Sequence, residues 1–143
     1  MKKKSFLAIV LVIICSFSMV LPAFATSYVP FASDQISSYS ISATAASGGK
    51  IAIDFSVTGA GKMSVIGAKS IAIYEKIGSR WEFAKSFSQG DSGMTKANAY
   101  IYGNTIYYNG VSGREYRVDV TVFAQDSTGA SDSRSKSFAV TAI

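Results

Sequence analysis

Along residues 36–143, apolar and polar positions alternate with a period of two, and glycine-rich turns interrupt the alternation. Such a pattern places successive side chains on opposite faces of an extended strand. No stretch keeps the three-to-four spacing of an amphipathic helix. The sequence therefore predicts an all-β domain over residues 36–143, an antiparallel two-sheet sandwich of about seven or eight strands.

The first predicted hairpin joins residues 41–45 to residues 51–57 through the loop at residues 47–49 (SGG). A three-residue loop, with its last glycine in the left-handed conformation, pairs Ile41 with Phe55. Small and large apolar side chains then share one face, whereas a two-residue loop would move Ile41 to the other face. We therefore expect Phe55 to be a structural residue of the core.

The middle of the chain predicts a loop and then a second hairpin. Residues 59–68 (GAGKMSVIGA) form the loop, and its apolar residues are expected to close one end of the core. Strands at residues 69–77 and 81–88 follow and meet around Gly78-Ser79.

Charge and burial separate two registers of this second hairpin. A two-residue loop sets Glu75 opposite Glu82 and leaves Trp81 away from the core. A three-residue loop sets Lys76 opposite Glu82 and buries Trp81. Like charges directly opposite are unfavourable, so we predict the second register, with Trp81 a core residue rather than a sugar-stacking platform. Lys85 then points inward on an edge strand, where it discourages association of edges.

A third hairpin is predicted around Gly103-Asn104, a good two-residue turn, between strands at residues 96–102 and 105–109. Counting outward from this turn makes a direct cross-strand pair of two tyrosines, with a third beside them. One outward face would then carry Tyr100, Tyr102 and Tyr107.

The last predicted strands cover residues 115–124 and 135–142. Before the first of them, residues 111–120 (VSGREYRVDV) combine a glycine-bearing turn with a tyrosine that begins an alternating strand. This segment resembles the end of a fibronectin type III domain, and the resemblance implies that Tyr116 is buried with its hydroxyl bonded to upstream backbone. The family's usual proline is missing from the turn, and Phe55 stands where the family has tryptophan, so an immunoglobulin-like domain is equally open. The layout also resembles small secreted proteins of Gram-positive bacteria.

The N-terminus has the layout of a secretory signal peptide. Lysines at residues 2–4 precede an apolar run over residues 6–21, and small residues then lead to a cleavage site between Ala25 and Thr26. The alternative is an uncleaved membrane anchor; after cleavage we expect no stable anchor. The predicted organisation is a signal peptide (1–25), an extended lead-in (26–35) and the β domain (36–143).

Removal of the signal peptide changes the charge. The whole chain has a net charge of +5, but 11 basic and 9 acidic residues remain after residue 25, a net charge of +2. No basic run is left, which excludes nucleic acid as an expected partner. Cys15, the only cysteine, is also removed, so the fold stands without disulfides in an oxidising setting. We expect a secreted protein from a Gram-positive bacterium.

The chain has no histidine, and without Cys15 it has no cysteine, so zinc sites and histidine- or cysteine-based nucleophiles are excluded. The acids alternate outward on strands or lie in turns, and residues 126–132 lack the ligand pattern of the known calcium loop. We therefore expect no enzyme, no metal and no cofactor. A hydrolase would need two carboxylates converging on one cleft, and it stays an alternative.

Aromatic residues are the feature that favours a binding function. Beside the three tyrosines of the third hairpin, Tyr74 and Phe123 are predicted to face outward near Arg117, and interfaces are enriched in aromatics and arginine. The expected function is a non-enzymatic extracellular module that binds protein or polysaccharide. The alternative is a structural protein that assembles by strand addition.

Overall fold

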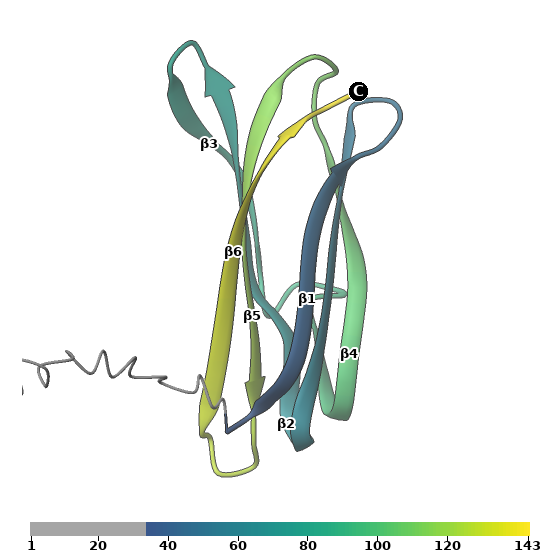
Figure 1. The fold of residues 1–143 in the computed structure, drawn as a ribbon, viewed down its shortest axis with the longest axis vertical. Helices are drawn as coiled ribbons and strands as arrows, with labels where there is room; N and C mark the ends of the chain where they lie inside the picture. The colour runs from purple at the N-terminus through teal and green to yellow at the C-terminus, as the bar shows by residue number, and fades with distance from the viewer. Residues whose placement is uncertain (1–33) are drawn as a thin grey trace, which may run out of the picture. The chain divides into compact units, whose positions relative to one another are not determined.

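The computed structural model describes residues 34–143, and in this part of the chain every regular element is a β-strand (Figure 1). The alternating sequence explains this outcome, because each strand has an apolar face to bury and a polar face for solvent. The six strands are β1 (Ile36–Ala45), β2 (Lys50–Ile77), β3 (Arg80–Ser88), β4 (Thr95–Asn109), β5 (Glu115–Gln125) and β6 (Ser131–Thr141).

All six strands belong to one antiparallel sheet organised around the 28-residue strand β2. The first part of β2 lies between β1 and β4, and its last part lies between β5 and β3, while β6 pairs with the far side of β5. The sheet curls, so that β1 approaches β6 (Figure 1). There the Lys136 ammonium lies 5.6 Å from the centroid of the Tyr39 ring. The all-β antiparallel prediction is confirmed, but one curled sheet is seen, and the two-sheet sandwich is not confirmed.

The predicted loop at residues 59–68 is wrong, because β2 runs through it. The main irregularity is a shift in register, where four residues of β2 between Thr58 and Met63 oppose a single residue of β4, and a smaller shift in the pairing with β1 lies at Gly59. Gly59 makes this possible, since a Cβ there would lie 2.6 Å from Met63 Cγ. An insertion of this kind bends a strand strongly, and here it contributes to the curl. Met63 and Ile66 are buried, as expected of residues at the end of the core.

The predicted hairpin at Gly103-Asn104 is also wrong, because both residues lie within β4 and pair with Ser56 and Phe55 of β2. Gly103 has no positive φ. It is needed for another reason, since a Cβ there would lie 2.8 Å from the Phe55 carbonyl oxygen. With this turn and the 59–68 loop both replaced by continuous strand, six strands are found rather than about seven or eight.

The first hairpin is confirmed in loop and register. Ile41 lies opposite Phe55, the Ala46 N–H donates to the Lys50 carbonyl across the three-residue loop, and Gly49 has φ +77°. Phe55 is buried, as predicted.

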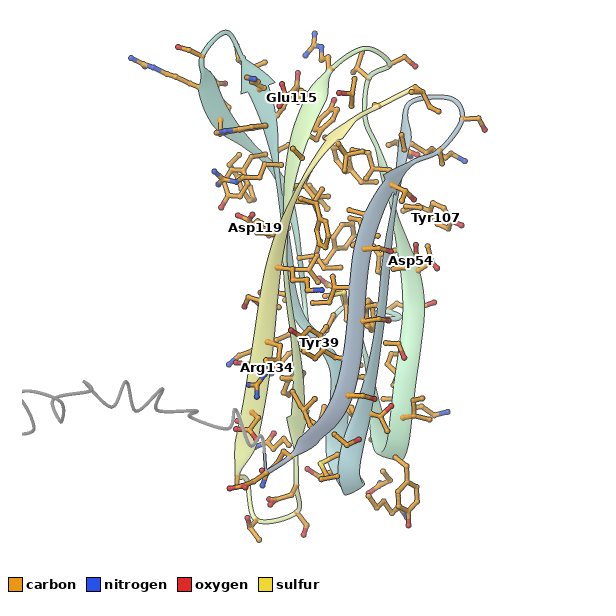
Figure 2. All side chains as sticks on the ribbon, viewed as in Figure 1. Tyr39, Asp54, Tyr107, Glu115, Asp119 and Arg134 are labelled. Atoms are coloured by element: carbon orange, nitrogen blue, oxygen red, sulfur yellow. The ribbon has the colours of Figure 1, made fainter. Side chains whose placement is uncertain are left out.

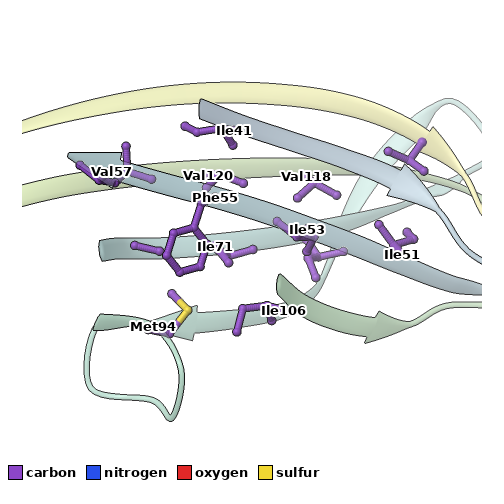
Figure 3. Packing of buried hydrophobic residues seen from close by; sticks show 14 of the residues in the cluster. Ile41, Ile51, Ile53, Phe55, Val57, Ile71, Met94, Ile106, Val118 and Val120 are labelled. Carbon is purple, nitrogen blue, oxygen red and sulfur yellow. The ribbon is translucent and has the colours of Figure 1, made fainter. Parts of the chain in front are cut away.

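The core fills the inside of the curl (Figure 3). Both halves of β2 contribute to it, and the alternating residues of β5 face them, as the sequence predicts for this strand. The largest fully buried side chains are Tyr116, Ile51, Ile53, Ile66, Ile71, Ile73, Met94, Val57, Val118, Val120 and Val122. Because the core occupies the concave side, the convex side of the sheet is left for contacts with other molecules.

Within residues 34–143, no helix is long and apolar enough to cross a membrane. The predicted signal peptide, its cleavage between Ala25 and Thr26, and most of the predicted lead-in at residues 26–35 lie outside the described residues.

Candidate binding surface

The β2–β3 hairpin has the register of the two-residue loop, so the predicted register is wrong. Gly78 and Ser79 form a two-residue turn, so Glu75 lies opposite Glu82 and Lys76 lies opposite Trp81. The prediction from facing charges considered only residues of the hairpin. Glu75 forms an ion pair with Arg114, which is 39 residues away in sequence. This contact offsets the like-charge pair and raises the pKa of Arg114.

This register moves Trp81 from the predicted core to the outer face of the sheet. Trp81 is half-buried, and Phe83, also predicted to be buried, is 63% exposed. A register shift between Ile73 and Tyr74 follows along the same hairpin. Lys85 of edge strand β3 lies opposite the buried Ile73, and its side chain is exposed.

Four side chains meet on this outer face, and we call Tyr74, Trp81, Phe83 and Arg117 the aromatic patch. Cross-strand pairing brings them together, since Tyr74 of β2 lies opposite Phe83 of β3 on one side and Arg117 of β5 on the other. The Arg117 guanidinium lies 4.3 Å from the centroid of the Tyr74 ring and 5.6 Å from that of Trp81. The Tyr74 and Phe83 rings meet edge to face at 5.9 Å. Of the predicted binding residues, the structure thus brings Tyr74 and Arg117 together.

Two ion pairs border the aromatic patch. Lys76 Nζ lies 2.6 Å from Glu115 Oε2 and also 5.7 Å from the Trp81 ring. Arg117 Nε lies 3.3 Å from Asp119 Oδ2. This contact is not a hydrogen bond, since Arg117 Nε has no hydrogen-bond partner among residues 34–143. Asp119 Oδ1 has none either, and both atoms are screened from solvent. Figure 2 shows Glu115 and Asp119 on the β5 side of the sheet.

The predicted cluster of three tyrosines does not form. Tyr100 and Tyr107 are 63% and 60% exposed, but they lie seven positions apart on one strand instead of opposite each other. Tyr102 faces the inner side, where its ring meets Phe55 edge to face at 6.0 Å and its hydroxyl donates to the Gly93 carbonyl. The cluster depended on the Gly103-Asn104 turn and is lost with it.

Phe123 is the second predicted binding residue that the structure corrects. It lies on the outer side of β5, opposite Gly67 and Ser133, but it is only 5% exposed. Its ring therefore offers little surface to a partner.

Tyr116 lies where the resemblance placed it. It is fully buried, and its hydroxyl accepts a hydrogen bond of 2.9 Å from the Val111 N–H, five residues upstream. The Tyr108 ring packs against it edge to face at 5.5 Å. Burial is the main cause of a raised pKa of Tyr108, and Tyr116 and Glu75 add to the effect.

The acidic loop between β5 and β6 is organised by its own backbone. Asp126 Oδ1 accepts hydrogen bonds from the Thr128 N–H and hydroxyl and from the Ala130 N–H, while its Oδ2 accepts from the Gln35 amide. The contacts with Thr128 and then with Gln35 lower the pKa of Asp126. In the described part of the chain, no three Asp, Glu, His or Cys side chains are grouped to hold a metal ion.

The sequence shows the aromatic residues of the patch, but it does not give the register of the β2–β3 hairpin that brings them together. The place of Trp81, in the core or on the surface as a platform for sugar, depends on the length of one turn. Phe83 and Asp119 gave no separate signal, because exposed aromatics and alternating acids are common on strands.

Comparisons with known proteins add little to this picture. No family model and no curated protein matches the chain. Among solved structures, the chain is similar to the crystal structure of Spo0M, a sporulation control protein from Bacillus subtilis, with 13% identity and a TM-score of 0.41. The match covers 74% of this chain and 49% of that chain, so this chain spans about half the length of that protein. Similarity at this level identifies neither a fold family nor a function.

Proposed function

We propose that this protein is a secreted, non-enzymatic binding module whose aromatic patch recognises an extracellular glycan. The observation that carries the proposal is the position of Phe83, Trp81 and Tyr74 on the outer face, beside the Arg117 guanidinium. Aromatic rings exposed in this way provide apolar surface with defined orientation, and Arg adds directional hydrogen-bond donors.

The charges around the patch favour a neutral polyhydroxyl partner over a charged one. The two cations that lie against the aromatic rings of the patch each have an acid beside them, Lys76 with Glu115 and Arg117 with Asp119. Paired charges give a small net field, yet they offer both donors and acceptors to hydroxyl groups. A ligand that reorients Arg117 would also satisfy its Nε and Asp119 Oδ1, which have no hydrogen-bond partner among the described residues.

Secretion and a fold relationship complete the proposal. The lysines, apolar run and Ala-Phe-Ala of residues 2–25 support export and cleavage before Thr26. The hydrogen bond from Val111 to the buried Tyr116 supports a fibronectin type III-like or immunoglobulin-like origin of the domain.

Retention of the purified protein on bacterial cell walls and on mucin-coated beads tests the function. We expect the wild-type protein to be retained on one of these glycan surfaces and to be released by a soluble oligosaccharide of the same type. Phe83→Ala and Arg117→Ala should each weaken retention about tenfold or more, because a few aromatic and arginine residues dominate the affinity of such surfaces.

Tyr39→Ala is the matched control, since Tyr39 is an exposed aromatic residue of β1, outside the patch. Retention equal in Phe83→Ala, Arg117→Ala and wild type would refute the proposed site. Retention that no sugar releases would indicate a protein partner instead.

A further inference from the structure

The free edge of β4 is a second surface with a distinct chemistry. Among residues 34–143, β4 pairs with β2 only, so the backbone groups of its other side have no strand to bond. Unpaired edges of this length are templates for another strand, and proteins usually protect them with charges, prolines or bulges.

Protection is weak on β4 compared with the other edges. The 15 residues Thr95–Asn109 contain one charged residue, Lys96, and no proline. Edge strands β3 and β6 have three charged residues each. The irregular part of β4, with its register shift against β2 and with Asn98 at φ +53°, lies before Ile101. Strand β1 is uncharged too, but it approaches β6 across the curl, and its outer face carries serine and threonine.

The outer face of β4 also exposes apolar side chains. Ile101 and Tyr107 are 57% and 60% exposed, and both lie on this face, since they pair with Thr58 and Ala52 on the outer side of β2. Thr105 lies between them and donates a hydrogen bond to Asp54, which holds this part of β4 against β2. Figure 2 shows Tyr107 and Asp54 on the β4 side of the sheet.

We propose that a second copy of this chain covers this edge, with the two β4 strands pairing antiparallel about a two-fold axis at Asn104. This register sets Ile101 of each copy directly opposite Tyr107 of the other. The two-fold axis repeats this apolar contact, so it occurs twice in the dimer. Gly103 then lies opposite Thr105, and Lys96 has no like charge facing it. A second copy suits the edge because the segment Ala97–Asn109 carries no charge, and this register lets its exposed apolar side chains face each other.

Pairing of this kind closes on itself. Each copy uses its β4 edge once, so the product is a dimer and not a growing fibre. The aromatic patch is built on the last part of β2, on β3 and on β5, so it remains available in each copy. A dimer would therefore present two patches, which raises the avidity for a repetitive glycan.

Sedimentation velocity over a range of protein concentrations tests the proposal. We expect a monomer–dimer equilibrium for the wild type, and Ile101→Lys or Tyr107→Lys should raise its dissociation constant about tenfold or more, because the two-fold axis doubles each loss. Ile77→Lys is the matched control, because Ile77 is 45% exposed at the end of β2, beside the β2–β3 turn and away from β4, and it should leave the equilibrium unchanged. A wild type that stays monomeric throughout, or a dimer that both β4 variants leave intact, would overturn the proposal.

Disulfide trapping tests the register without destabilising charges. In a Cys15→Ser background, the double variant Ile101→Cys with Tyr107→Cys should oxidise to a covalent dimer. Neither single variant should form a covalent dimer, since in the proposed pairing neither residue lies opposite the same residue of the other copy. Covalent dimers from both single variants, or none from the double variant, would contradict the register and with it the two-fold pairing at Asn104.

Discussion

At the scale of single residues, Tyr116 shows how a side chain fixes a turn. Its ring is fully buried in the core while its hydroxyl accepts the N–H of Val111 in the loop between β4 and β5. A residue that joins core and loop in this way holds the start of β5 in place, so that the outward residues of that strand, Arg117 and Asp119, reach the aromatic patch.

Tyr116→Phe keeps the ring and removes the acceptor of that hydrogen bond. We expect it to lower the free energy of unfolding by about 1–2 kcal/mol, the usual cost of leaving a partly buried group without its partner. Urea denaturation measures the change. Tyr107→Phe, at an exposed tyrosine, should change it little, and equal stability of wild type and Tyr116→Phe would show that the bond contributes nothing.

Gly103 is the residue whose role the structure changes most. Its Cβ-free backbone lets β4 lie against β2, where a methyl group would approach the Phe55 carbonyl oxygen to 2.8 Å and Ser56 Cβ to 3.1 Å. We expect Gly103→Ala to destabilise the protein by about 1–3 kcal/mol, because the contact is with backbone that moves only with the strand. Gly90→Ala, where the added Cβ meets nothing within 4 Å, is the control for thermal denaturation. A neutral Gly103→Ala would argue for the turn that the sequence suggested.

At the scale of elements, the sequence was sufficient where a hairpin depends on its own residues. The loop at residues 47–49 and the pairing of Ile41 with Phe55 follow from alternation and from two glycines. It was insufficient where distant strands decide. Gly103-Asn104 has the composition of a turn, yet pairing with β2 holds it extended, and local propensity does not contain that information.

The site depended on the same kind of distant contact. Glu75 and Glu82 face each other across the two-residue turn, and Arg114, from the loop before β5, pairs with Glu75. Without a three-dimensional structure, that charge cannot be assigned to the hairpin. Tyr74 and Arg117 were predicted as neighbours by alternation alone, whereas Trp81 and Phe83 required the correct register.

The β5–β6 loop gives an element-scale prediction about pH. Hydrogen bonds lower the pKa of Asp126 below its ordinary value of 3.8, so the folded state favours the charged form. Its contribution to stability is therefore complete above that value and is lost as the pH falls through the lower folded-state pKa. Asp126→Asn keeps one acceptor oxygen and removes the titration, so its stability should fall less steeply below about pH 4 than that of wild type. Chemical denaturation at several pH values measures the slopes, with Asp34→Asn at an exposed acid as control; parallel slopes for Asp126→Asn and wild type would contradict the assignment.

At the scale of the whole domain, one curled sheet separates the core from the two proposed interaction surfaces. The concave side is filled by the core, the convex side presents the aromatic patch on β2, β3 and β5, and the free edge of β4 carries one charged residue, Lys96. Because β2 pairs with four other strands, a change in its register would displace both surfaces together. Recognition by rigid strands rather than by loops suits a flat partner, since the side chains are already held in place before binding.

Trp81 allows the most direct test of glycan binding by the aromatic patch, because it is the only tryptophan in the chain. Its fluorescence can be followed while soluble cello- and chito-oligosaccharides of four or more units are added to the protein. We expect a saturable change in intensity or emission maximum with at least one of these series, lost in Arg117→Ala and kept in Tyr39→Ala. No change with any of these sugars in a folded protein, or a change that Arg117→Ala retains in full, would contradict the claim.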